Sequence, residues 1–205
     1  MIQIVPAAQA PAVMAAMRER SASKNEAIQA AAAAIMDDVK KRGWAAVEEY
    51  SVKFDGKAPC EIPREELEAA YRACPAPLVK AMEHAAANIR DYNEKLLTRT
   101  QEWTSPDGGV VGRVVRGLTR VGIYVPGGTA AYPSSVLMNA VPAKVAGVEE
   151  LIMVTPPTEN LNQAVLAAAW IAGVDRVIAV GGAQAVAALT YGAGFIPRVD
   201  KLVGP

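Results

Sequence analysis

Apolar and polar residues are arranged differently in the two halves of the chain. Up to about residue 100, apolar residues recur at steps of three and four, which is typical of helices with one buried side. One such stripe consists of Ile28, Ala32, Ile35 and Val39. The capping box Ser23-Lys24-Asn25-Glu26 predicts the start of this helix, because both outer side chains can bond free amides there, and Gly43 predicts its end.

Further helices are expected in the same half. One runs from Trp44 to Phe54, another begins after Pro63, and the longest follows Pro77. The apolar face of the longest helix is formed by Leu78, Met82, Ala85, Ile89, Tyr92 and Leu96. Residues 1–100 are therefore expected to form a helical N-terminal region. The stripes predict packing and say nothing about chemistry.

Residues 101–120 are expected to form a β-hairpin connection. Asp107-Gly108 lies between flanks rich in strand-forming residues and predicts a tight turn. Arg113, Arg116 and Arg120 fall in this stretch, and two interpretations of them stay open: a solvated face of the hairpin or an anion site.

The remaining residues, 121–205, alternate between strands and helices. The expected strands are Val121–Val125, Leu151–Val154, Val177–Val180 and Leu202–Val203, and the expected helices are Ser134–Ala146, Asn160–Ala172 and Ala183–Tyr191. The strands are continuously apolar, as in parallel sheets that are covered on both faces. Pro142 should kink or split the first of these helices. The predicted fold class is α/β: a helical N-terminal region, then a Rossmann-like, doubly wound, mostly parallel sheet that is incomplete at the C-terminus.

Two glycine clusters follow strands of this sheet, where ligands bind in such folds. Gly127-Gly128 and Gly181-Gly182 each feed the start of a helix, whose free amides favour anions such as a pyrophosphate. Tyr124 and Gln184 add polar side chains, although the glycines could equally serve only as tight turns. The motif G-x-G-x-x-G is absent after the first strand, so the residues alone predict a nucleotide-like ligand and nothing finer.

Composition narrows the class of protein. The chain has 21 basic and 21 acidic residues, so its balanced charge gives no electrostatic reason to expect nucleic acid or an anionic membrane as a partner. No stretch of 18 uncharged apolar residues and no secretion signal is visible, and the two cysteines form no metal or disulfide motif. We expect a cytoplasmic protein with incidental thiols at Cys60 and Cys74.

The sequence supplies no catalytic residue and no metal site. His84 is the single histidine and is expected on a solvated helix flank rather than as a general base. A zinc site normally needs three or four His, Cys or carboxylate ligands, and no pattern here assembles them.

Several segments resemble histidinol dehydrogenase. They are Arg120–Val148, with the motif Ile-Tyr-Val-Pro-Gly-Gly; Val180–Gly192, with Gly-Gly-Ala-Gln-Ala; Pro197–Pro205; and Val47–Asp55. The resemblance implies NAD-dependent oxidation of L-histidinol to L-histidine in two steps, at the end of histidine biosynthesis. It also implies a zinc-containing homodimer. By resemblance, Tyr124 and Gln184 contact NAD, together with the glycines at 127, 128, 181 and 182.

The resemblance covers about half of the usual family length. It places the Glu-His acid/base pair and the zinc ligands in the other half, while Gly192–Ile196 departs from the polar tract usual there. We therefore expect an N-terminal portion of the enzyme that is inactive alone, arising by truncation, by proteolysis or as a natural short paralogue. One alternative is a non-catalytic paralogue that binds a nucleotide or a protein. Another is an unrelated α/β enzyme that binds a phosphorylated metabolite at Gly127-Gly128.

Overall fold

The computed structural model describes residues 4–127, 132–157 and 161–204, without the side chains of residues 20–25. A short 3₁₀ turn, Ala7–Gln9, precedes the first helix. The helices are α1 Ala10–Arg42, α2 Trp44–Asp55, α3 Arg64–Ala73, α4 Ala76–Leu96, α5 Pro133–Val145, α6 Gln163–Ala172 and α7 Gly182–Tyr191. The strands are β1 Cys60–Ile62, β2 Gln101–Thr104, β3 Val110–Arg113, β4 Arg120–Tyr124, β5 Glu150–Thr155, β6 Arg176–Ala179 and β7 Lys201–Val203.

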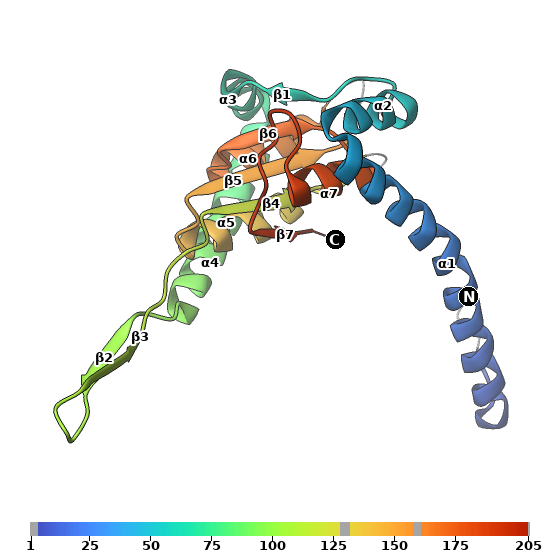
Figure 1. The fold of residues 1–205 in the computed structure, drawn as a ribbon. Helices are drawn as coiled ribbons and strands as arrows, with labels where there is room; N and C mark the ends of the chain where they lie inside the picture. The colour runs from blue at the N-terminus through green and yellow to red at the C-terminus, as the bar shows by residue number, and fades with distance from the viewer. Residues whose placement is uncertain (1–3, 128–131, 158–160, 205) are drawn as a thin grey trace.

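The main sheet has the strand order β1-β6-β5-β4-β7 (Figure 1). Strands β6, β5, β4 and β7 are parallel, as the continuous apolar runs predicted. Strand β1 pairs antiparallel with β6 and forms the edge. This strand was not predicted, because it has three residues and only Ile62 is buried. Such a short segment shows no alternation of apolar and polar residues. The parallel strands run third, second, first, fourth in chain order, which is the Rossmann-like arrangement.

Helices cover both faces of this sheet, so the doubly wound α/β prediction is confirmed. Successive residues of β5 divide between the faces, because side chains alternate along a strand. Leu151 and Met153 pack into a core that includes buried residues of α3, α4, α5 and α6. Ile152 and Val154 pack into a second core with buried residues of α1, α2 and α7.

Two elements extend away from the sheet as arms (Figure 1): α1 on one side and the β2–β3 hairpin on the other. The hairpin pairs as predicted around Asp107-Gly108. The predicted start of α1 at Ser23 is wrong, because the helix begins at Ala10 and continues through that position. The preceding segment is rich in alanine, methionine and arginine, which are strong helix formers.

The predicted apolar stripes are buried over only part of their length. On α1, Val39 is buried against α7 and α2, whereas Ile28 is 65% exposed. On α4, Met82 is buried, but Tyr92 and Leu96 lie on the part that extends toward the hairpin and are exposed. An apolar stripe predicts which face of a helix can be buried. How much of that face is buried depends on the elements that pack against it.

Two smaller predictions about helices are also resolved. The longest helix is α1 rather than the one near Pro77, and that helix begins at Ala76. Pro142 does not split α5, which continues to Val145, because its fixed φ is close to the helical value and it removes only the backbone bond of its own position.

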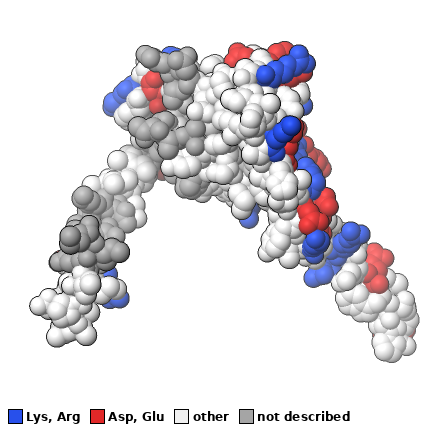
Figure 2. Space-filling model, turned by 180° about the vertical axis from the view of Figure 1, so that it is seen from behind, with Lys and Arg blue, Asp and Glu red and all other residues white. Residues whose placement is uncertain are grey.

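Charged side chains on the far side of the molecule are mixed in sign. Figure 2 shows Lys and Arg interspersed with Asp and Glu along α4, on the side of the molecule that leads to the β2–β3 hairpin. Lys95 pairs with Asp91 one helical turn away on this arm, at 2.6 Å. No helix of the described ranges is long and apolar enough to cross a bilayer.

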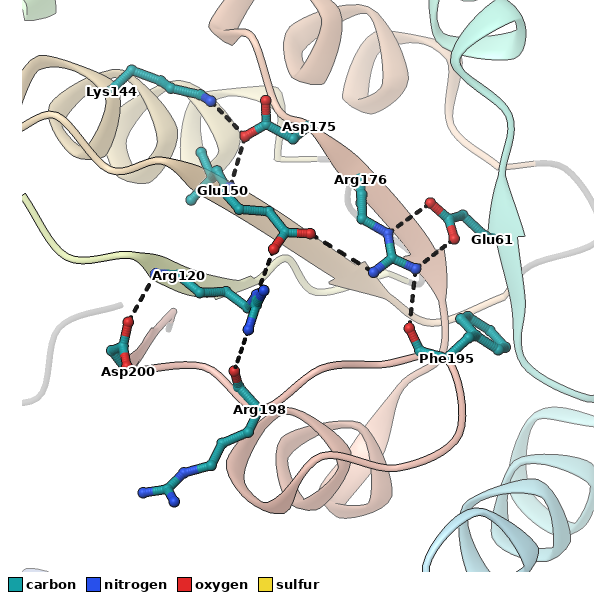
Figure 3. Close-up of polar contacts among 10 residues, drawn as sticks. Glu61, Arg120, Lys144, Glu150, Asp175, Arg176, Phe195, Arg198 and Asp200 are labelled. Carbon is teal, nitrogen blue, oxygen red and sulfur yellow. Dashed lines mark hydrogen bonds and ion pairs between the residues drawn. The ribbon is translucent and has the colours of Figure 1, made fainter.

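The amino ends of the parallel strands are joined by ion pairs (Figure 3). Arg120, Glu150 and Arg176 are the first residues of β4, β5 and β6. The parallel register pairs Arg120 with Glu150, and it pairs Arg176 with Ile152, two residues further along β5 and on the same face as Glu150. Arg120 donates to Glu150 at 2.5 Å, and Arg176 donates to Glu61 of β1 at 2.6 and 2.9 Å. Arg176 also donates to the Phe195 carbonyl. Of the arginines considered for a solvated hairpin face, Arg120 is therefore an ion-paired strand start.

Candidate functional site

A cavity of about 370 Å³ lies at the opposite, carboxyl end of the sheet. Its lining residues are Tyr124, Gly182, Val186, Leu202, Val203 and Gly204. They come from the ends of β4 and β7 and from the first turns of α7. Strand order reverses between β4 and β7, and in open α/β sheets this reversal is where ligands bind.

The glycine turns after β4 and β6 pack on the same residue, Pro156, which follows β5. A Cβ on Gly181 would stand 2.7 Å from Pro156 Cγ, which is closer than real side chains approach. A Cβ on Gly127 would stand 3.3 Å from the Pro156 carbonyl oxygen, a tight contact. Pro156 therefore lies between the two turns, and the absence of a side chain at Gly181 is required by this approach.

Tyr124 links the two glycine motifs directly. Its hydroxyl oxygen accepts a hydrogen bond of 3.2 Å from the backbone N–H of Gly182. The neighbouring N–H, that of Gly181, donates to the Asp55 carboxylate at the end of α2. Both amides at the start of α7 are thus partnered within the chain. A pyrophosphate at this turn would have to replace these acceptors, so its binding here stays a prediction.

Gln184 lies in the first turn of α7 and is 1% exposed. Its Nε2 donates a long hydrogen bond, 3.4 Å, to Asp55 Oδ2. Its Oε1 is buried without a partner and lies 2.6 Å from the position that a Cβ on Gly182 would take. Gly182 has φ +63°, a conformation that favours glycine. An unsatisfied buried acceptor costs about 1–3 kcal/mol, so this carbonyl destabilises the fold unless a ligand donor meets it.

Asp55 was not singled out by the sequence. It ends α2 before the left-handed Gly56, a pattern that predicts only a helix terminus. Burial raises the pKa of the Asp55 carboxyl, while the hydrogen bonds from Gly181 and Gln184 act in the opposite direction. No local signal could have found the contact, because 129 residues separate Asp55 from Gln184.

The structure brings together most of the residues that the sequence proposed. Tyr124 and Gly182 share the cavity, and Gly181 and Gly127 flank Pro156. Gln184 lies beside Gly182 but does not line the cavity itself. Gly128 lies outside the described residues, as does the end of its turn.

Metal-binding chemistry is not assembled in the described ranges. No group of three or more His, Cys, Asp or Glu side chains there could hold a metal ion. Cys60 and Cys74 are free thiols. His84 is exposed on α4 and contacts Asn88, in agreement with the predicted helix flank.

A larger cavity, about 500 Å³, lies between α4, α5 and residues 115–121. Its wall is mostly apolar, with Leu96, Leu118 and Met138 among the lining residues. The smaller cavity is the stronger candidate, because it lies at the strand reversal and beside a buried, unpartnered polar atom.

These features define the chain as an α/β protein with a doubly wound, Rossmann-like sheet. A model of the family "Histidinol dehydrogenase" matches residues 18–205, and the chain belongs to that family.

Histidinol dehydrogenase of Bordetella parapertussis is 54% identical over 190 residues, covering 90% of this chain and 43% of the relative. That of Dechloromonas aromatica is 52% identical over 200 residues, covering 95% and 46%. The crystal structure of histidinol dehydrogenase from Elizabethkingia anophelis matches with a TM-score of 0.80 and 31% identity, covering 87% of this chain and 42% of that one. The chain spans about half the length of the relatives it matches.

Proposed function

We propose that this chain forms the NAD-binding portion of a histidinol dehydrogenase, an enzyme that oxidises L-histidinol to L-histidine. The observation that carries the proposal is the cavity between β4 and β7, with the unpartnered Gln184 Oε1 beside it. A neutral amide acceptor and a phenol hydroxyl suit the carboxamide and ribose groups of a dinucleotide, which carry N–H and O–H donors.

NAD, when bound, accepts the hydride removed from the substrate. The residues of this chain would bind and orient it. Tyr124 offers its hydroxyl at the cavity wall, and Gly182 lets the backbone approach a ligand without a Cβ. Gln184 offers an acceptor that no protein group occupies.

Zinc does not fit the residues that the structure describes, since they assemble no set of three ligands. No step of the proposal uses a metal in this chain. For the whole enzyme we propose the form that the resemblance implies, a zinc-containing homodimer with L-histidinol as substrate.

Calorimetric titration of the purified 205-residue chain with NAD tests the proposal. We expect saturable binding that weakens about tenfold in Tyr124→Phe and in Gln184→Ala, since each loses about one hydrogen bond. Absence of NAD binding, or wild-type affinity in both variants, would contradict the assignment of this cavity.

The alternative of a non-catalytic, nucleotide-binding paralogue predicts that NAD binds but is not reduced in the whole protein. We expect the 205-residue chain alone to produce no NADH from histidinol, with or without added zinc, because no carboxylate, imidazole or amine side chain is among the described residues that line the cavity. Turnover by the pure chain, followed at the NADH absorbance, would show that the catalytic groups are present after all.

A further inference from the structure

The side-chain amide of Gln184 has two different ends, and one of them has an assigned partner. Nε2, which can only donate, faces the Asp55 carboxylate, while Oε1, which can only accept, is buried against Gly182 with no donor. If the amide were turned by 180°, Oε1 would face the carboxylate oxygens, and two acceptors would oppose each other. The charge of Asp55 therefore selects one orientation of the amide.

Asp55 is itself held in place by the same turn. The backbone N–H of Gly181 donates to its carboxylate, so the end of α2 is tied to the start of α7. Asp55 is not needed to end its own helix, because Gly56 in the left-handed conformation does so and donates to the Val52 carbonyl. The carboxylate is thus free to serve the glycine turn.

We propose that Asp55 is a positioning residue for the dinucleotide site: it fixes the Gln184 amide so that Oε1, which lies against Gly182 at the cavity wall, is the acceptor left for the ligand. The inference rests on the proposed function, because the missing donor would come from bound NAD. It also restricts which groups of NAD can bond Oε1. An acceptor oxygen cannot bond an ionised phosphate, so the group that meets Oε1 is one of the N–H or O–H donors of NAD: the nicotinamide carboxamide, the adenine amino group or a ribose hydroxyl.

The variant Asp55→Asn tests this without removing the shape of the contact. The Oδ1 atom of the introduced asparagine can still accept from Gly181, but its Nδ2 would face Gln184 Nε2, so the Gln184 amide should turn and present its NH₂ group to the ligand. We expect Asp55→Asn to melt at or above the wild-type temperature and to bind NAD about tenfold more weakly. Asp55→Ala should lose both stability and affinity.

A second substitution should restore the acceptor. In the double variant Asp55→Asn/Gln184→Glu, one oxygen of the introduced carboxylate accepts from the introduced amide and the other is presented to the ligand, with the net charge of the pair unchanged. We expect this double variant to recover most of the NAD affinity, whereas Gln184→Glu alone sets two carboxylates against each other and should not. A merely structural role for Asp55 predicts no such rescue.

A matched control is Glu61→Gln, which makes the same carboxylate-to-amide change at the other end of the sheet. It should leave NAD affinity unchanged. If Asp55→Asn binds NAD within twofold of wild type while folding normally, Asp55 does not position Gln184 and the inference is overturned.

Failure of the proposed function can be told apart from failure of this inference by NMR without ligand. The side-chain NH₂ signals of Gln184, assigned by their loss in Gln184→Leu, should be protected from exchange in the wild-type chain and shift in Asp55→Asn. Unchanged signals would overturn the positioning role even if NAD binds. Shifted signals in a chain that binds no NAD would instead count against the proposed function alone.

Discussion

At the amino ends of β4, β5 and β6, charged side chains are paired with one another, whereas a buried polar atom beside the carboxyl ends has no partner. Glu150 has Arg120 and Arg176 beside it, and Asp175 accepts from Lys144 and from the Leu151 N–H. At the other end, Gln184 Oε1 is buried with no donor. One end of the sheet is thus satisfied within the chain, and the other retains an unmet acceptor.

This contrast separates residues that stabilise the fold from residues that serve a ligand. A group whose hydrogen bonds are complete in the free protein stabilises it and gains nothing from a ligand. A buried group that lacks a partner destabilises the free protein and can regain that free energy on binding. Substitutions at the two ends should therefore separate stability from NAD affinity.

The largest effect on stability is expected from Arg176→Ala. Arg176 joins β6 to β1 through both oxygens of Glu61 and to residues 193–198 through the Phe195 carbonyl. Removing these partly buried, charge-assisted bonds should cost roughly 2–3 kcal/mol and lower Tm by roughly 5–10 °C in thermal unfolding. NAD affinity should change little.

Arg72→Ala is the matched control, since Arg72 forms an exposed pair with Glu68 within α3. Exposed pairs contribute at most about 1 kcal/mol. If both arginine variants melted at the same temperature, the ion pairs at the strand starts would not be stronger than exposed surface pairs. The amino end of the sheet would then not be the stabilising end.

A smaller effect, with both stability and affinity changed, is expected from Gly181→Ala. The added Cβ must displace Pro156, and forced overpacking costs roughly 1–3 kcal/mol. Because Gly181 also donates to Asp55, movement of the turn should weaken NAD binding. Gly127→Ala, whose Cβ would meet Pro156 at 3.3–3.4 Å, is the milder counterpart and should cost less than about 1 kcal/mol. A reversed order of the two variants would show that Pro156 does not lie firmly between the turns.

The sequence predicts one end of the sheet better than the other, and the reason is the distance along the chain over which each feature is encoded. Turns such as Gly181-Gly182 and strands such as Val121–Val125 are local, so composition and period reveal them. Arg120, Glu150 and Arg176 are 30 and 26 residues apart and meet only because parallel pairing brings the starts of their strands to the same edge of the sheet. Sequence pattern alone gives no register between separate strands.

The same holds for the candidate site: its local motifs could be predicted from the sequence, but the contacts between them could not. Tyr124 and Gly182 could be proposed from their own motifs, but their hydrogen bond depends on how α7 crosses the sheet. Asp55 could not be proposed at all, because its role depends on α2 packing against α7. The predicted free amides at the start of α7 are also partnered in the fold, which no local motif indicates.

The smallest expected effect is on how folding stability depends on pH. The carboxylates at the two ends of the sheet should change stability in opposite directions as the pH rises. The Arg176 guanidinium lowers the pKa of the Glu61 carboxyl below its usual range, so ionised Glu61 stabilises the fold above that range and the contribution is lost in acid. Burial raises the pKa of the Asp55 carboxyl, so its contribution is present in acid and lost as the pH rises through the raised value.

Thermal unfolding between about pH 3 and pH 7 can separate the two contributions. Relative to the wild type, Glu61→Gln should lose stability near neutral pH and approach it in acid, by less than about 1 kcal/mol since Glu61 is partly exposed. Asp55→Asn should gain stability near neutral pH, and that gain should shrink as the pH falls. Parallel curves for the two variants would mean that the carboxylates at the two ends of the sheet are held in the same way, and the distinction between a stabilising end and a ligand-binding end would then have no electrostatic basis.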